Sequence, residues 1–183
     1  RGGRSWRGIF LLCSGQVSHW QFAELSDLQP FAFGEFELSG ALNTYRSDLA
    51  LDQVSVQGVV AEDAINVVQS AFEFDHLAIR HTRSDAIDSD FSDGSITASS
   101  FVDIGGDGID SSGADMAVRD VEFQGVADKA ISIGEASEME VEDATIQDIG
   151  VGVAAKDYSR ARINKLRVKN ARVAAVMAYS KKP

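Results

Sequence analysis

Apolar residues return along this chain at a fixed spacing. The repeating positions are Leu42, Ile65, Ile87, Ile109, Ile131, Val153 and Val176. The four inner steps (65 to 87, 87 to 109, 109 to 131 and 131 to 153) are identical, and each outer step is longer by a single position. A fixed period of about 20 residues predicts a solenoid, in which each repeat forms one coil stacked on the last. Positions one period apart then become neighbours at about one strand spacing, ~4.8 Å.

Short stretches of alternating apolar and polar residues fill each repeat. Examples are residues 95–98, 101–104, 139–141 and 146–149. A second apolar series runs through Val56, Ile79, Phe101, Phe123, Ile146 and Val168. Such alternation predicts half-buried strands, and the Asp, Asn, Ser and Gly residues between them predict turns. The pattern therefore predicts an all-β fold, a right-handed single-stranded parallel β-helix of about seven or eight coils (183/22).

We expect a single β-helix domain over residues 1–183, with regular coils over 41–180. Residues 1–40 keep the strand-like alternation but lose the spacing, which predicts irregular N-terminal coils with an aromatic insertion at Phe31–Phe36. Leucine-rich repeats share the period, but their Leu/Asn consensus is absent, and helix-pair repeats need longer helical stripes. The sequence contains no apolar run of the length that a transmembrane helix needs, so no membrane span is predicted.

Charge is distributed unevenly along the chain. The net charge is −11, yet residues from Lys156 onward carry nine Lys or Arg against one acid, Asp157, which makes +8 and leaves −19 for the rest. One interpretation is that these basic coils discourage edge pairing at an open solenoid end. The other is that they dock an anionic partner, such as another protein domain, or the acidic face of another copy of this chain. Nucleic-acid binding is not predicted, because the polar columns are acidic and the basic coils lack an aromatic platform.

Two polar columns accompany the apolar series. The first column lies two positions before each apolar residue of the series and contains Asp63, Asp85, Asp107 and Lys129. This position is expected at a bend, where a polar side chain can reach the surface. The second column lies one position after each apolar residue and contains Asp88 and Asp110. Stacked aspartates about 5 Å apart repel one another by roughly 1 kcal/mol per pair in water. Lys129, backbone N–H groups at the turns or a bound Ca²⁺ would each offset that repulsion.

Carboxylate oxygens alone suit Ca²⁺ rather than zinc or copper. The candidate ligands are Asp85, Asp107 and Asp110. The candidate binding residues are Asp63, Asp85, Asp88, Asp110 and Glu135. Glu135 lies four positions after Ile131 and is expected to flank a groove beside the aspartate columns. The three histidines, at 19, 76 and 81, do not fall on the columns and show no zinc-ligand spacing.

Several phrases of the sequence resemble a known superfamily. They are residues 62–66, 84–92, 105–110, 128–135 and 155–157. They resemble bacterial parallel β-helix repeat proteins of the pectate-lyase-like superfamily, and are most similar to β-helix regions that accompany spore-coat-protein-H-type kinase-like modules. The resemblance spans about residues 38–182 and implies a secreted or surface-exposed right-handed β-helix.

The phrase Gly105–Asp110 is also similar to the polygalacturonase motif Asn-Thr-Asp-Gly-Ile-Asp. Asp107 and Asp128 match that family's aspartates, but Lys129 stands where the paired Asp is expected and Val151 where the His is expected. Inverting hydrolysis needs one carboxylic acid and one carboxylate base, so the mismatch counts against it. Pectate-lyase-like enzymes use Ca²⁺ and a basic residue, a role that Lys129 would take, although neighbouring carboxylates raise a lysine pKa.

The sequence thus leaves three hypotheses. The leading one is a non-catalytic extracellular or cell-surface module that binds a cation or a polysaccharide on its aspartate-lined face. The second is a polysaccharide lyase or glycoside hydrolase with Asp107, Asp128 and Lys129 as catalytic residues. The third is a structural spacer. An enzyme should have an open groove beside the column, with Lys129 within hydrogen-bond range of Asp107. A binding module should show a cation or exposed aromatic side chains beside the acids. A spacer should fold the aspartates onto turn N–H groups.

Overall fold

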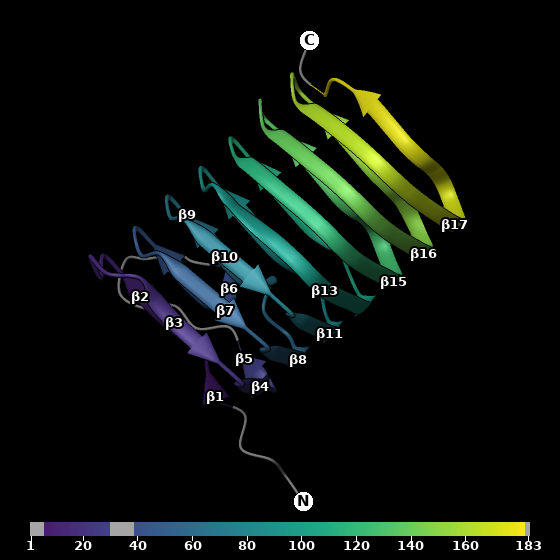
Figure 1. Cartoon of the computed structure of the whole chain (residues 1–183). Helices are drawn as coiled ribbons and strands as arrows, with labels where there is room; N and C mark the ends of the chain where they lie inside the picture. Colours follow the sequence, from purple (N-terminus) through teal and green to yellow (C-terminus); the bar gives the residue numbers. More distant parts are fainter. Residues whose placement is uncertain (1–5, 30–38, 182–183) are drawn as a thin grey trace, which may run out of the picture.

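The computed structural model describes residues 6–29 and 39–181, and shows stacked parallel strands wound into a right-handed solenoid with three faces (Figure 1). The expected aromatic insertion at Phe31–Phe36 lies outside the described residues. The first face contains β2 (Ile9–Leu12), β6 (Gly40–Tyr45), β9 (Asp63–Val68), β12 (Asp85–Asp90), β14 (Ile109–Ser112) and the last parts of β15 (Asp115–Gly134), β16 (Glu138–Lys156) and β17 (Arg160–Tyr179).

The second and third faces are built in the same way. The second contains β3 (Ser18–Gln21), β7 (Leu49–Asp52), β10 (Phe72–Asp75) and the first parts of β13 (Gly94–Ile104), β15, β16 and β17. The third contains β4 (Glu24–Ser26), β8 (Ser55–Val59), β11 (Ala78–Thr82) and the middle parts of the same long strands. A separate short pair joins β1 (Trp6–Arg7) to β5 (Leu28–Gln29). No helix among the described residues is long and apolar enough to span a bilayer.

The apolar series forms the core as predicted. On the first face Ile65 pairs in register with Leu42 and with Ile87, and all three are fully buried. On the third face Phe101 and Phe123 are register partners whose rings stack with centroids 4.6 Å apart. One period of the sequence is therefore one coil in space.

The number of regular coils is lower than predicted. Six complete turns run from Leu42 to Val176, all within the described residues. Ile9 pairs with Leu42, and the stretch of chain between them is half as long again as a regular coil, so the first turn is irregular. Dividing the chain length by the period assumed that every residue belongs to a regular coil, and this assumption fails for the longer step from Ile9 to Leu42.

Left-handed residues make the sharp corner between the second and third faces. They are Gln53, His76, Ala98, Asp120, Asp143 and Lys165, with φ between 49° and 54°. A single residue in this conformation turns an extended chain without a loop, at a cost for any residue with a Cβ. This explains why β13, β15 and β16 continue from one face to the next. At the corner between the first and second faces, serine hydroxyls accept N–H bonds from the preceding coil, as Ser70 does from Ser47 at 3.0 Å.

Candidate functional site

The aspartates of the first column lie where the chain passes from the third face to the first. Asp63 and Asp85 begin β9 and β12 and pair in register, and Asp107 precedes β14 one coil further on. Asp63 is only 2% exposed and Asp107 only 6%. The expectation that these side chains reach the surface is therefore wrong for both, because their carboxylates are enclosed by the coils that they join.

Two of these carboxylates hold the backbone of the next coil. Oδ1 of Asp85 accepts the N–H of Asp107 at 2.7 Å, and Oδ1 of Asp107 accepts the N–H of Lys129 at 2.8 Å. Asp63 instead accepts a hydrogen bond from the hydroxyl of Ser39. Such bonds satisfy buried turn N–H groups, as the spacer hypothesis expected of these side chains.

Lys129 ends the column as an internal counter-ion. Its Nζ lies 3.3 Å from both carboxylate oxygens of Asp107 and 2.5 Å from Oδ2 of Asp128. Burial lowers the pKa of Lys129, but the hydrogen bonds and charges of Asp128 and Asp107 outweigh it and raise the pKa overall. This direction was predicted from the sequence, and it makes Lys129 a poor base at neutral pH.

The second column runs along the first face beside the aspartates. Asp88 pairs in register with Asn66 and with Asp110, and Asp110 pairs with Ser132. Nδ2 of Asn66 donates to Oδ2 of Asp88 at 3.2 Å. In the part of the chain that the structure describes, Oδ1 of Asn66 and Oγ of Ser132 are buried without a hydrogen-bond partner. Buried polar atoms are normally paired, so these two oxygens leave hydrogen-bonding capacity at both ends of the Asp88–Asp110 pair.

Lys156 is a site residue that the sequence analysis did not identify. Its Nζ lies 3.4 Å from Oδ1 of Asp110, two coils away, and the residue is only 7% exposed. The side chain crosses Gly134, where an added Cβ would lie 3.3 Å from Cε of Lys156. The sequence did contain a signal for this contact. Gly134 lies one coil before Lys156 in the same column, and a glycine there leaves room for the long lysine side chain.

Burial and mutual repulsion raise the pKa of several carboxyl groups in this cluster. Desolvation is the main cause in each case and raises the pKa of Asp63 to about 7, of Asp88 to about 8 and of Asp107 to about 6. Charges of neighbouring aspartates add to the effect at Asp88. Desolvation also raises the pKa of Asp85 and of Asp90. At neutral pH the cluster therefore holds protons that ordinary aspartates would have lost.

The predicted calcium ligands come together in space. Asp85, Asp107 and Asp110 each offer a carboxylate oxygen, and these oxygens lie within 4.8 Å of one another. An all-oxygen set of this kind suits Ca²⁺. A second such group, Asp52, Asp75 and His76, was not anticipated, because the sequence analysis compared only the columns beside the Ile65 series, and Asp52 and Asp75 lie on the second face.

The remaining predicted residues, Asp128 and Glu135, are exposed. The side chain of Asp128 is 61% exposed and contacts the site through Lys129. Glu135 follows β15 and is close enough for its charge to raise the pKa of Asp90 further, after desolvation and Asp110. Phe91, directly after Asp90, is 64% exposed. The binding hypothesis expected exposed aromatic side chains beside the acids, and Phe91 is next to Asp90 in the sequence.

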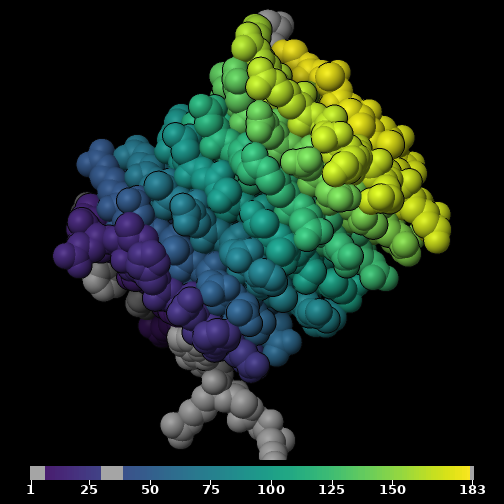
Figure 2. All heavy atoms as spheres, in the orientation of Figure 1, coloured from purple at the N-terminus to yellow at the C-terminus, as the bar shows by residue number. Residues whose placement is uncertain are grey.

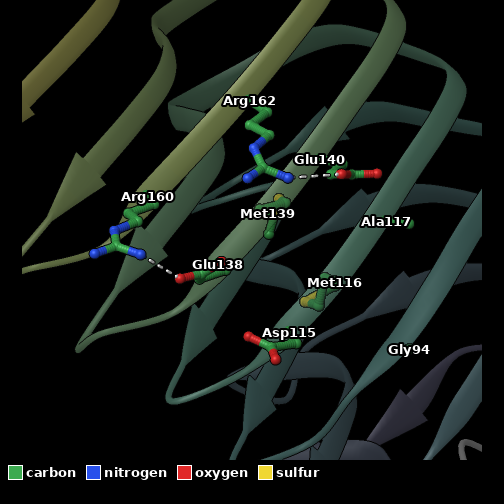
Figure 3. Close-up of a pocket in the computed structure, with 9 residues that line it drawn as sticks. All are labelled: Gly94, Asp115, Met116, Ala117, Glu138, Met139, Glu140, Arg160 and Arg162. Atoms are coloured by element: carbon green, nitrogen blue, oxygen red, sulfur yellow. Dashed lines mark hydrogen bonds and ion pairs between the residues drawn. The ribbon is translucent and has the colours of Figure 1, made fainter.

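A hollow of about 340 Å³ lies on the second face, away from the aspartate columns. Figure 3 shows its lining, with Met116 and Met139 between charged side chains from β15, β16 and β17. Arg160 and Arg162 reach from β17 to Glu138 and Glu140. None of the predicted site residues lines this hollow.

Comparison with known proteins identifies the family. Residues 63–182 match the family model of the right-handed beta helix region, so this chain belongs to that family. Among solved structures, the catalytic domain of a GH87 alpha-1,3-glucanase in complex with nigerose is similar with a TM-score of 0.48 and 9% identity, over 99% of this chain and 57% of that one. A D1069A form with tetrasaccharides gives a TM-score of 0.28 and 9% identity, over 96% and 58%. The chain thus spans less than two thirds of either structure. The search of curated proteins found no significant match.

Proposed function

We propose that this chain is an extracellular or cell-surface β-helix module that binds Ca²⁺, and with it a polysaccharide, without catalysing a reaction. The observation that carries the proposal is the convergence of Asp85, Asp107 and Asp110, whose carboxylate oxygens lie within 4.8 Å of one another. A divalent cation would replace the protons that the raised pKa values keep in this cluster, and would relieve the repulsion among the carboxylates.

Two further observations support a ligand on this face. Oδ1 of Asn66 and Oγ of Ser132 are buried without a partner among the described residues, beside the Asp88–Asp110 pair. Phe91, the residue after Asp90, has an exposed ring. A row of polar groups together with an exposed aromatic ring is typical of carbohydrate sites, where hydroxyls bond and ring faces stack. The raised pKa of Lys129 favours binding over catalysis.

Calcium titration of the metal-stripped protein tests the proposal. We expect saturable binding by calorimetry, with a Kd of about 10⁻⁴ to 10⁻³ M as in extracellular calcium modules. Binding near pH 6.5 should release protons, because the pKa of Asp107 is about 6 and that of Asp63 about 7. Proton release is measured by repeating the titration in two buffers with different ionisation enthalpies.

The control variants separate charge from structure. In Asp85→Asn/Asp107→Asn the amide oxygen can still accept the backbone N–H of the next coil, so the fold is kept while two ligand charges are removed. This double variant should lose calcium binding. The matched double variant Asp52→Asn/Asp75→Asn, on the second face, should keep it. If the wild-type protein binds no calcium, and Asp85→Asn/Asp107→Asn is as stable as the wild-type protein or more stable, the aspartates serve only the turns and the chain is a structural spacer.

A polysaccharide-active enzyme is the second candidate. It is favoured by the 3.3 Å contact of Lys129 with Asp107, and by carboxyl groups whose raised pKa keeps protons available near neutral pH. A screen of uronate polymers and neutral glucans for released reducing ends or unsaturated products, with and without Ca²⁺, tests this alternative. Turnover that is lost in Lys129→Met but not in the matched variant Lys165→Met would establish catalysis.

A further inference from the structure

Lys156 is a cation of this chain that reaches into the aspartate columns from a distant coil. The coils stack in chain order, which Figure 2 shows as successive bands of colour. Lys156 ends β16, whereas Asp110 lies in β14, two coils earlier, and Nζ of Lys156 spans that distance to lie 3.4 Å from Oδ1 of Asp110. Lysine is rarely buried unless it is paired. The chain therefore buries one of its own cations against a candidate calcium ligand.

The two lysines of the cluster are held with different strength. Nζ of Lys129 lies 3.3 Å from both carboxylate oxygens of Asp107 and 2.5 Å from Oδ2 of Asp128. Nζ of Lys156 has one hydrogen-bond acceptor among the described residues, the Asp110 oxygen, at a distance longer than that of a strong hydrogen bond. An ammonium group has three N–H donors, so this contact leaves most of its capacity unused. Lys156 is therefore the lysine that separates from its acid at the lower cost.

The balance of charge favours an exchange of Lys156 for a divalent cation. When ionised, Asp85, Asp107 and Asp110 carry three negative charges, and the two lysines compensate two of them. A Ca²⁺ ion added to this arrangement would leave an excess positive charge at a site that is largely buried, where charges interact strongly. If the ammonium group of Lys156 leaves, Ca²⁺ neutralises the two negative charges that remain.

Gly134 gives the side chain of Lys156 its path across the intervening coil. An added Cβ at Gly134 would lie 3.3 Å from Cε and 3.7 Å from Nζ of Lys156. The stem of the lysine thus lies along the backbone, as the apolar stems of long charged side chains often do. Lysine has a flexible four-carbon stem, so rotation about its side-chain bonds moves the ammonium group to solvent without a change in the strands.

We propose that Lys156 is a tethered counter-ion that occupies the Asp110 side of the calcium site and is exchanged for Ca²⁺ when the ion binds. The inference rests on the proposed calcium function and assigns the regulation of that site. At low calcium the lysine compensates a buried carboxylate that would be costly to leave alone. The ion binds through Asp110 only in molecules from which the ammonium group has moved away, and the apparent affinity is reduced by that fraction. Lys156 therefore sets the calcium concentration at which the site fills.

Replacement of Lys156 should strengthen calcium binding. In calorimetric titrations we expect Lys156→Met and Lys156→Gln to lower the Kd for Ca²⁺ about tenfold, the change that follows if the ammonium group occupies Asp110 about nine-tenths of the time. The matched control is Lys165→Met, because Lys165 is 58% exposed and its Nζ lies 3.9 Å from Glu142, and it should leave the Kd unchanged. Urea unfolding without calcium checks the fold of each variant. Lys156→Met should be less stable than wild type there, and calcium should restore the stability.

Acylation of the wild-type protein measures the displacement directly. A lysine-specific acylating reagent, followed by mass spectrometry of the peptides, reports how accessible each amine is. Saturating Ca²⁺ should increase the labelling of Lys156, whose side chain is only 7% exposed against Asp110, and should leave the labelling of Lys165 unchanged. This measurement needs no variant, so it decides the question even if Lys156→Met does not fold. Calcium binding without a change in Lys156 labelling would show that the ion enters without displacing the lysine, and would refute the inference.

The titrations also separate this inference from the proposed function. If the wild-type protein binds calcium and the two Lys156 variants bind it no more tightly, the tethered counter-ion is refuted while the calcium module stands. If only the Lys156 variants bind calcium measurably, the lysine does occupy the site, and the wild-type chain is not a calcium module. If neither the wild-type protein nor the folded variants bind calcium, both proposals are wrong.

Discussion

Raising the pH from 5 to 9 should destabilise the folded protein, and Asp88→Asn should remove a large part of that loss. Desolvation, followed by the charges of Asp63, Asp90, Asp110 and Asp85, raises the pKa of Asp88 from 3.8 to about 8. In the unfolded chain Asp88 loses its proton near pH 4, whereas in the folded protein it keeps the proton until about pH 8. The folded state therefore binds more protons between these values, and its stability falls as the pH rises through this window.

The size of the effect follows from the same shift. One pKa unit corresponds to about 1.4 kcal/mol, and after allowance for partial solvent access we expect Asp88 to account for about 2–4 kcal/mol. The raised pKa of Asp63, about 7, acts in the same direction. Below pH 4 both states are protonated and the stabilisation is complete. Urea unfolding at pH 5 and pH 9 measures the difference.

Two comparisons make this prediction specific. Asn resembles a protonated Asp, so Asp88→Asn should be close to wild type at pH 5 and more stable than wild type at pH 9. Asp148 lies on the exposed surface, and hydrogen bonds from Asn170 and Gln147 lower its pKa. Asp148→Asn should therefore leave the loss at alkaline pH unchanged. A wild-type protein that is equally stable at both pH values would contradict the assignment of a protonated carboxyl cluster.

Phe123→Ala should lower the free energy of unfolding by about 3–5 kcal/mol, the range for large aromatic truncations in protein cores. The ring of Phe123 is 1% exposed and stacks on Phe101 at 4.6 Å. It also packs against Gly108, where an added Cβ would lie 2.6 Å from the ring. The truncation thus leaves a cavity between the third face and the bend that carries Asp107.

Denaturant titration at pH 5, where the protein is expected to be more stable than at pH 9, measures the loss in the free energy of unfolding. The control is Phe91→Ala, because Phe91 is 64% exposed and its removal should change stability by no more than about 0.5 kcal/mol. Similar losses for the two variants would show that burial at position 123 does not govern the packing of the coils.

Much of the fold could be predicted because a solenoid repeats its core in the sequence. The series through Ile65 and Ile87 identified the stacked strands, and register pairing confirms it. The first coil could not be found in this way. Ile9 precedes Leu42 by more than one regular period, so its place in the core follows from its pairing with Leu42 and not from spacing.

The candidate site was predicted in part. Sequence spacing identified the aspartates that converge, because positions one period apart become neighbours. Their burial was not predicted, since it depends on the path of the backbone at the bend. The contact of Lys156 with Asp110 was also missed, because a long side chain reaches across two coils and columns were compared only one coil at a time.

The bonds from Asp85 and Asp107 to the next coil have an evolutionary consequence. Asparagine can make the same backbone contact without the charge, so a single-base change in a codon can remove one negative charge and leave the solenoid intact. The reverse change can restore the charge at equally small cost to the architecture. The charge of this column can therefore change by neutral drift, coil by coil, while the scaffold persists.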